Sequence, residues 1–229
     1  MTTLIIPAVS LGNVPQLAVD LLIHTLRLTP SQALDDTYLH PFASPRDHLP
    51  DQTEPLGIST GLELYEDNKK QLAVVQQRSP VVTPYTKKFA TDVLVPLAGK
   101  YDRVILVDLT NGGFDDVSRL HTIDVVTSDV VLNAKVEKLS LQDGIHEDDN
   151  DHFLGTTRAV IEARGKNVTS DVVLAYVYEG DNTNDAFALA DKLASILELG
   201  TQRWQCPVSW TGMYGLRQHS NAMEDGLYG

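Results

Sequence analysis

Apolar residues along this chain fall into continuous runs and into stretches with helical spacing. The continuous runs are short and rich in Val, Ile and Leu, as is typical of strands buried on both faces of a sheet. They lie at residues 4–9, 104–107 and 172–177. Because each run leads through a polar turn towards a helix, the pattern predicts an α/β fold around a mixed sheet. The position of the first run at the start of the chain favours a central strand.

The first stretch with helical spacing follows the turn Gly12-Asn13. Leucines recur at helical intervals from residue 17 to residue 26. Asn13 is a residue type that caps helices, and Pro15 suits a first helical turn. The pattern therefore predicts a helix that begins at Asn13 and ends at about Arg27.

The same signals predict the remaining helices and strands. The helices span about 84–99, 158–163 and 184–199. Gly200 follows the last of these, where a glycine cap belongs. Apolar runs at 62–65 and 72–75 flank a polar turn and predict a hairpin, and weaker strand candidates lie at 123–126 and 130–132.

Residues 29–57 differ from the rest of the chain. Five of the eleven prolines lie between Pro30 and Pro55, and the aromatic residues there show no period. This composition predicts an irregular surface excursion, part of it mobile. Since no repeat or linker separates two cores, we predict one α/β sandwich domain over residues 1–212, with a central mixed sheet flanked by helices. A flexible C-terminal tail is expected at 213–229.

Charge and cysteine usage narrow the possible partners. The chain carries 18 Lys and Arg against 31 Asp and Glu, a formal net charge of −13. Such a chain repels phosphate backbones, so we expect no nucleic-acid partner. The apolar runs are too short for a membrane span, and the N-terminus lacks the basic segment of a signal peptide. We therefore expect a soluble intracellular protein without a membrane partner, and the single Cys206 fits a reducing compartment.

Motifs for cofactors, metals and nucleophiles are missing from the sequence. Neither a dinucleotide-binding nor a P-loop glycine pattern occurs. The acidic stretch 142–152 lacks the spacing of a calcium loop or of a zinc helix, which favours a solvated loop. Cys206 stands beside Trp204 and Pro207, which favours a packed thiol over a catalytic one. We expect no catalytic residue, no cofactor and no metal, hence a protein that is not an enzyme.

Two features keep an enzymatic alternative open. The Gly12-Asn13 loop at a helix start could hold an anion through backbone N–H groups, although a tight turn with a cap is favoured. Asp108 ends a buried strand, where α/β enzymes often carry a functional carboxylate. The alternative is a nucleoside-type small-molecule enzyme with this loop as anion cradle and Asp108 as acid.

Three blocks of the sequence resemble the proteasome assembly chaperone 2 family. The first is IPAVSLGNVPQLAVDL at residues 6–21, and the second is YEGDN at 178–182 with Asp185-Ala186 after it. The third is Arg203-Trp204 with Pro207 and Ser209-Trp210, similar to the family's Trp-Pro-Trp segment. The blocks occur in family order and bracket most of the chain, whereas residues 29–150 depart freely.

The resemblance implies a non-enzymatic role and a defined set of partners. Members of this family pair with proteasome assembly chaperone 1, and the heterodimer binds the α subunits of the forming core particle. It promotes ring assembly and keeps regulators off the immature ring, in the cytoplasm and the nucleus. The implied fold is an α/β sandwich like that of nucleoside phosphorylases. A chaperone-like binding module for a different assembly is the remaining alternative.

The last residues match a docking pattern of such chaperones. Leu227, Tyr228 and Gly229 form a hydrophobic-Tyr-any terminus. The resemblance implies that the terminal carboxylate pairs with a lysine between two α subunits while Tyr228 inserts its ring. Aromatic residues scattered through the chain suit the core of the heterodimer interface. They are Tyr38, Phe42, Trp204 and Trp210.

Overall fold

The computed structural model describes most of the chain. The described residues are 1–67, 69, 71–111, 120–128, 155–164, 170–178 and 180–212. The strand predicted at 130–132, the acidic loop at 142–152 and the tail at 213–229 lie outside the described residues. In the part that is described, no helix has both the length and the apolar composition to cross a membrane.

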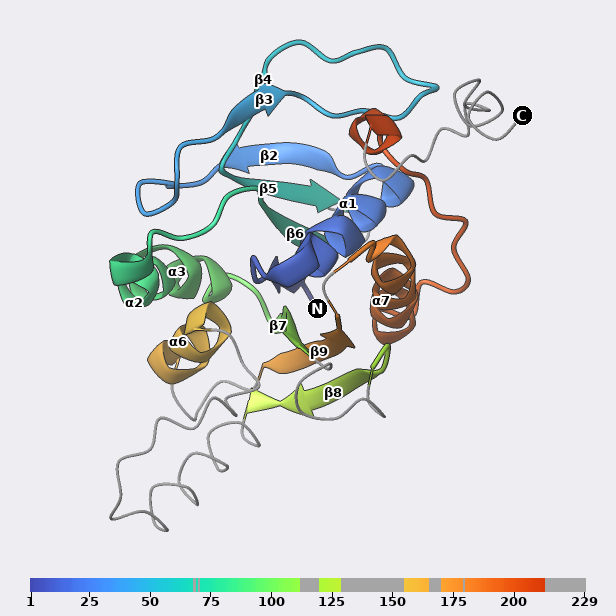
Figure 1. Cartoon of the computed structure of the whole chain (residues 1–229). Coiled ribbons are helices and arrows are strands. Elements are labelled where there is room, and N and C mark those ends of the chain that lie inside the picture. Colours follow the sequence, from blue (N-terminus) through green and yellow to red (C-terminus); the bar gives the residue numbers. More distant parts are fainter. Residues whose placement is uncertain are drawn as a thin grey trace, which may run out of the picture.

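A seven-stranded mixed sheet forms the centre of the molecule (Figure 1). Its strands, in sheet order, are β2 (Thr29–Ala33), β5 (Leu62–Asp67), β6 (Leu72–Gln77), β1 (Thr3–Pro7), β7 (Arg103–Asn111), β9 (Asp171–Val177) and β8 (Ile123–Thr127). The four inner strands β6, β1, β7 and β9 are parallel, whereas β5 and β8 run antiparallel to their neighbours. The prediction of a mixed sheet with the first strand at its centre is confirmed.

The register of the inner strands explains their continuous apolar runs. Ile5 of β1 lies between Val74 of β6 and Ile105 of β7. These three side chains belong to one core cluster, while their neighbours Leu4 and Ile6 belong to a second cluster on the other face. Since both faces of the sheet are covered, the apolar positions along the inner strands are buried on either face.

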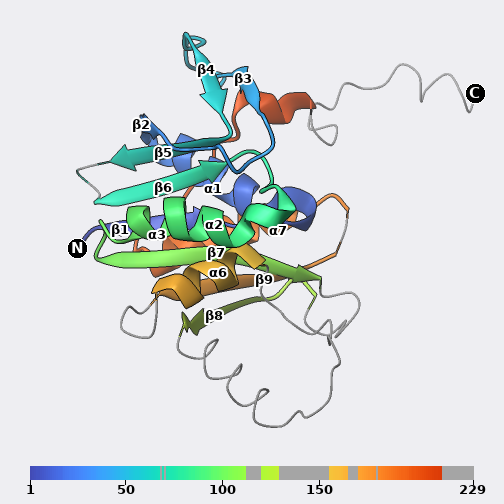
Figure 2. The ribbon, with the colours of Figure 1, turned by 90° about the vertical axis from the view of Figure 1, so that its left-hand side faces the viewer.

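Helices cover both faces of the sheet, which makes a three-layer sandwich (Figures 1 and 2). The first face carries α1 (Val14–Leu26) and α7 (Thr183–Ile196), which pack against each other. The second face carries α2 (Thr86–Phe89), α3 (Val95–Ala98) and α6 (Gly155–Arg164). The predicted helical flanks are therefore confirmed, while the likeness to nucleoside phosphorylases stays a prediction.

The helix predicted at 84–99 is distorted at its centre. A 3₁₀ turn, Thr83–Tyr85, leads into α2, and a π-helical turn, Ala90–Leu94, joins α2 to α3. Pro96 lies directly after this turn in α3. A proline inside a helix lacks an N–H donor and clashes with the carbonyl four residues before it, so a widened turn upstream accommodates it.

The helix caps differ from their predictions. Asn13 occupies the cap of α1, but its φ is 53° and its side chain makes no capping hydrogen bond. The prediction of a glycine cap at Gly200 is wrong, because α7 ends at Ile196 and Glu198 takes the left-handed conformation with φ of 56°. The backbone N–H of Leu199 then bonds the carbonyl of Ala194, a Schellman closure. Arg27 ends α1 in the same way.

The predicted excursion at 29–57 is partly regular, so its description as irregular is wrong at two places. Residues 29–33 form β2, an exposed edge strand whose Pro30 and register shift protect the edge from further pairing. Farther along, β3 (Ala43–Pro45) pairs antiparallel with β4 (Ile58–Thr60), outside the main sheet. We call residues 43–60 the flap.

Candidate functional site

The first two sequence blocks meet at Gly12. This glycine has a φ of 67°, and a Cβ atom built on it would lie 2.0 Å from Nδ2 of Asn182. Asn182 is buried at the start of α7, where the neighbouring Asp181 accepts hydrogen bonds from the backbone and hydroxyl of Thr183. The turn after β1 therefore requires glycine for two reasons, its backbone conformation and the close approach of a side chain.

The third block packs onto the same face of the sheet. Trp210 is 2% exposed and meets Phe187 of α7 edge to face, with 6.2 Å between the ring centroids. The hydroxyl and backbone N–H of Ser209 both donate to the Asp47 carboxylate in the flap. Trp210 is thus a core residue, so its assignment to a heterodimer interface is wrong because its ring is enclosed within the chain itself.

The other three predicted interface aromatics are partly accessible. Tyr38 stacks obliquely against Tyr85, with centroids 5.8 Å apart, and donates to the Asp92 carboxylate at 2.8 Å. Trp204 is half-buried and donates from Nε1 to Asp191 at 2.8 Å. Phe42 is half-buried and lies directly before the flap. Their role in an interface stays a prediction.

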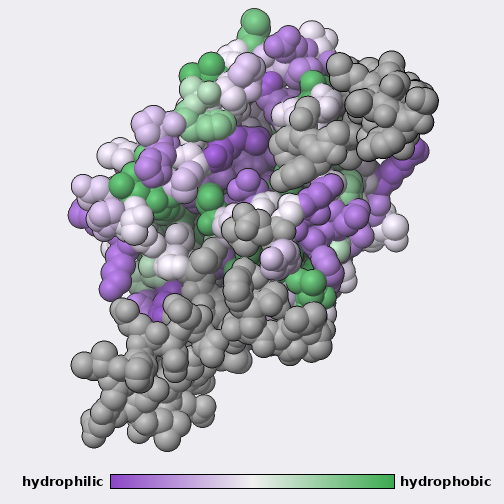
Figure 3. All heavy atoms as spheres, viewed as in Figure 1, coloured by the Kyte–Doolittle hydropathy of each residue, from purple (hydrophilic) through white to green (hydrophobic). Residues whose placement is uncertain are grey.

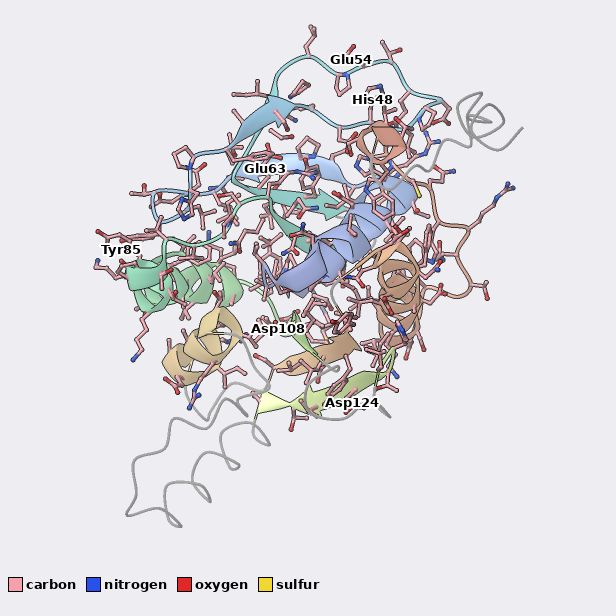
Figure 4. All side chains as sticks on the ribbon, in the orientation of Figure 1. His48, Glu54, Glu63, Tyr85, Asp108 and Asp124 are labelled. Carbon is pink, nitrogen blue, oxygen red and sulfur yellow. The ribbon has the colours of Figure 1, made fainter. Side chains whose placement is uncertain are left out.

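A cavity of about 520 Å³ lies under the flap. Its walls come from the first turns of α1, the carboxyl end of β6, the flap and the segment Val208–Trp210. We call it the α1–flap cavity. Hydrophilic residues gather in the recess below β3 and β4 in Figure 3, and His48 and Glu54 mark its flap side in Figure 4.

A buried polar network forms the floor of the α1–flap cavity. Asp20 of α1 pairs with Arg78, with 3.0 Å between Oδ1 and Nη2, and both side chains are largely buried. Gln76 donates from Nε2 to Asp20 at 2.6 Å, and Gln16 donates to the carbonyl of Ala8 at 2.8 Å. Burial disfavours the charged guanidinium, but the combined attraction of its neighbours, with Asp20 foremost and Tyr65 and Asp47 after it, raises the pKa of Arg78.

A buried tyrosine and a half-buried histidine lie near this ion pair. The hydroxyl of Tyr65 donates to Glu63 at 2.9 Å, and burial together with this carboxylate raises the pKa of Tyr65 to about 12. On the next turn of α1, burial lowers the pKa of His24, although Asp20 and Asp47 attract its protonated form. The first face of the sheet therefore contains a connected set of polar groups inside its apolar core.

Several polar atoms around the cavity have no hydrogen-bond partner. They are Gln16 Oε1, Gln76 Oε1, Gln77 Oε1, Arg46 Nε, Arg78 Nε, His48 Nδ1 and Trp210 Nε1. All of these residues line the α1–flap cavity. An unpaired buried polar group costs about 1–3 kcal/mol, so their concentration at one place marks a candidate binding site.

The predicted enzymatic residues belong to opposite faces of the sheet. The side chain of Asn182 lies beside Gly12, on the side where a Cβ atom would be. Asp108 is fully buried and accepts from the backbone N–H of Leu109 at 2.8 Å. By strand alternation Asp108 shares the second face with Leu106, whereas α1 covers the first. Asp108 also lies well apart from the flap residues in Figure 4.

The remaining candidates are Cys206, possible metal ligands and the C-terminal docking residues. Cys206 is half-buried against the first core cluster, and burial raises the pKa of its thiol, as expected for a packed cysteine. Within the described ranges, no three His, Cys, Asp or Glu side chains gather as metal ligands would. The docking residues Leu227, Tyr228 and Gly229 lie outside the described residues, so their role stays a prediction.

Sequence reasoning missed the polar network. Its residues come from α1 and from the end of β6, two segments that are 56 residues apart at the bond between Gln76 and Asp20. One signal was present: Gln16 and Asp20 stand one turn apart in a helix that is otherwise almost wholly apolar. Polar residues at such positions need partners, and the sequence alone does not name them.

Comparison with known proteins finds a matching family model and relatives that match most of this chain. A family model described as the PAC2 family matches residues 4–193. Proteasome assembly chaperone 2 of Danio rerio is 30% identical over 237 residues, which covers 93% of this chain and 91% of the relative. Proteasome assembly chaperone 2 of Homo sapiens is 25% identical over 241 residues, with the same shares covered.

Two solved structures have a similar fold. PbaA of Pyrococcus furiosus, described as an archaeal homologue of proteasome-assembly chaperone, superposes with a TM-score of 0.59 at 15% identity, covering 87% of this chain and 82% of that chain. PbaB, described as an archaeal proteasome activator from the same organism, gives a TM-score of 0.53 at 16% identity, covering 87% and 85%. At such identities the likeness establishes the fold.

Proposed function

Because the chain belongs to the PAC2 family, we propose that it is a proteasome assembly chaperone that pairs with a proteasome assembly chaperone 1-like subunit and binds proteasome α subunits. The heterodimer would promote formation of the α-ring and keep regulators off it until it is complete. The observation that carries this proposal is the match to proteins named proteasome assembly chaperone 2 over 93% of the chain.

The geometry favours this role over the nucleoside-type enzyme. An enzyme of that kind would need the Gly12-Asn13 loop and Asp108 to act on one substrate. The side chain of Asn182 fills the space beside Gly12, and Asp108 is buried under the opposite helical layer. A fold of this class without a joined acid and anion cradle suits a binding role.

We place the contact with the α-ring at the C-terminus. The carboxylate of Gly229 would pair with a lysine between two α subunits, Tyr228 would insert its ring and donate its hydroxyl, and Leu227 would pack at the rim. Burial of one Leu or Tyr contributes about 1.5–3 kcal/mol, and ordering each residue of the tether costs about 1–2 kcal/mol. The tail is therefore weak alone and acts together with contacts from the folded body, which raise its effective concentration to about millimolar.

The test is affinity capture of α subunits by tail variants of the full chain. We expect Tyr228→Ala to weaken capture by about 10–100-fold, since it removes most of the buried ring. A residue appended after Gly229 has a similar effect because it moves the carboxylate, and Leu227→Ala has a smaller one. Tyr214→Ala is the matched control in the same tail, outside the terminal motif.

Partner pairing and location are tested separately. Co-expression with a chaperone 1-like subunit should give a stable heterodimer in size-exclusion chromatography, and tail variants should pair normally. Unchanged α-subunit capture by both Tyr228→Ala and the appended residue would contradict tail docking. We propose that the complex works in the cytoplasm and the nucleus, and cell fractionation that finds it in neither would refute this location.

A further inference from the structure

We propose that the α1–flap cavity binds a small, uncharged, planar heterocycle whose edge carries an N–H donor beside an acceptor, as nucleobases and nicotinamide do. This site goes beyond the chaperone role and involves a different part of the molecule from the tail.

The cavity lies where an open α/β sheet places its ligands. After β1 the chain continues into α1 on the first face, whereas after β6 it continues into α2 on the second face. Since β1 and β6 are adjacent and parallel, their carboxyl ends flank a crevice at a topological switch point. Gln16 follows the end of β1, and Gln76 lies at the end of β6.

Unpaired hydrogen-bonding atoms of both kinds surround the cavity. The amide nitrogens of Gln16 and Gln76 already donate to Ala8 and Asp20, so the orientation of both carboxamides is fixed and their oxygens remain as acceptors. Trp210 Nε1 and Arg46 Nε remain as donors from the other walls. An occupant that satisfies both sets must donate and accept, as an amide-type edge does.

The charge of the cavity disfavours an anion. Three carboxylates, of Asp20, Asp47 and Glu54, line it together with the guanidinium groups of Arg46 and Arg78. Asp20 and Arg78 neutralise each other, and Asp47 accepts from Ser209.

The remaining walls suit the face of a ring. Leu17, Phe42, Pro45 and Val208 supply apolar surface between the polar groups. A volume of about 520 Å³ falls within the range of small-molecule sites, which combine apolar walls with a few placed polar groups. The chemistry points to recognition of the ring by contact and of its edge by the glutamine oxygens and the indole N–H.

The two tryptophans of the chain supply an internal control for the test. Trp210 lines the cavity with an unpaired Nε1, whereas the Nε1 of Trp204 is engaged with Asp191. Adenine, uracil and nicotinamide are each titrated to millimolar concentration into the ¹⁵N-labelled full chain. We expect at least one probe to shift the indole signal of Trp210 saturably and to leave that of Trp204 in place.

A cavity-filling variant gives the second arm. Ser44 lines the cavity from β3, and Ser44→Phe should fill it without touching the polar network; we expect at least a tenfold loss of probe affinity. Ser31→Phe, on the exposed strand β2, is the matched control and should bind normally. The proposal is overturned if no probe shifts Trp210, if both indoles move alike, or if Ser44→Phe binds as well as the unaltered chain.

Discussion

The two faces of the sheet use the same strands for different purposes. Under α2, α3 and α6 the core cluster consists of aliphatic side chains around Phe89, and Asp108 is the buried carboxylate on this face. Under α1 and α7 the apolar core is interrupted by the buried network of Asp20, Arg78 and Gln76, with unpaired atoms around a cavity. The unpaired polar atoms on the first face cost stability, as is common in functional regions, so we expect the second face to contribute more to the stability of the fold.

The two faces also differ in how the chain builds them. The first face joins the start of the chain, the flap and the segment ending at Trp210, which are distant in sequence. The three blocks that resemble the chaperone family all lie on or beside this face. The difference shows that the first face depends on contacts between distant segments, whereas the second face is built mainly from apolar side chains that pack together.

The largest effect is expected on the apolar face. Phe89 is fully buried, so Phe89→Ala should lower the free energy of unfolding by about 3–5 kcal/mol, through lost burial and the cavity left behind. Urea denaturation measures it. Leu56→Ala is the control, since this flap side chain is 97% exposed and its loss should change little. A cost below about 1 kcal/mol for Phe89→Ala would deny the second face its stabilising role.

A smaller loss is expected from Gly12→Ala, which tests the contact between the sequence blocks. The new Cβ would overlap Asn182 in addition to straining a backbone with φ of 67°, and we expect about 2–4 kcal/mol. Gly200→Ala is the matched control, because its φ is 70° but no atom lies within 4 Å of the new Cβ. It should cost only about 1 kcal/mol, the strain alone. Equal losses for the two variants would mean that Asn182 moves away freely.

The polar face can be tested through its buried ion pair. Arg78→Met should destabilise the chain by about 2–3 kcal/mol, since it leaves the buried Asp20 with the Gln76 amide in place of a cation. Arg27→Met breaks an exposed pair with Asp51 and should cost about 0.5 kcal/mol or less. Denaturation of both variants at one salt concentration gives the difference. If the two variants lose the same free energy of unfolding, the buried ion pair on the first face contributes no more to stability than an exposed ion pair does.

The smallest effect is a pH dependence carried by the polar face. Burial lowers the pKa of His24 below its ordinary value of 6.5, with Asp20, Asp47, Arg78 and His48 nearby. The unfolded chain therefore binds the proton more readily than the folded chain, so this contribution to stability is complete above pH 6.5 and is lost as the pH falls below it. Stability of His24→Gln, measured by denaturation from pH 5 to pH 8, should fall less steeply on acidification. Parallel curves for the two chains would contradict this reading.

Most of the scaffold could be predicted from the sequence because its signals are local. The continuous apolar runs of β1, β7 and β9 indicate strands that are covered on both faces of the sheet. The leucine spacing of α1 indicates a helix that packs against the core. The exposed strand β2 was missed because Pro, Ser and Gln carry no strand signal and its pairing with β5 comes from tertiary structure.

The site could not be predicted to the same extent. The partners of Gln16 and Asp20 are set by the approach of β6 to α1, which no local pattern encodes. The end of α7 was misplaced because Glu198 adopts a left-handed conformation that propensity assigns to glycine, and packing of Leu197 and Leu199 on the core favours that turn. Trp210 was assigned to an interface because an aromatic near a chain terminus gives no sign of which surface encloses it.

The attachment of the C-terminal segment to α1 also constrains when the protein can fold. The backbone N–H of Gln205 bonds the hydroxyl of Thr25 across 180 residues, and Trp210 packs in the cluster that contains Ile5. Figure 1 shows the segment after α7 passing the end of α1. Contacts so distant in sequence form slowly, because the entropy of closing the loop is lost before the contacts compensate for it. During synthesis β1 is made long before Trp210, so the core cluster that contains Ile5 is complete only after the segment ending at Trp210 has been made.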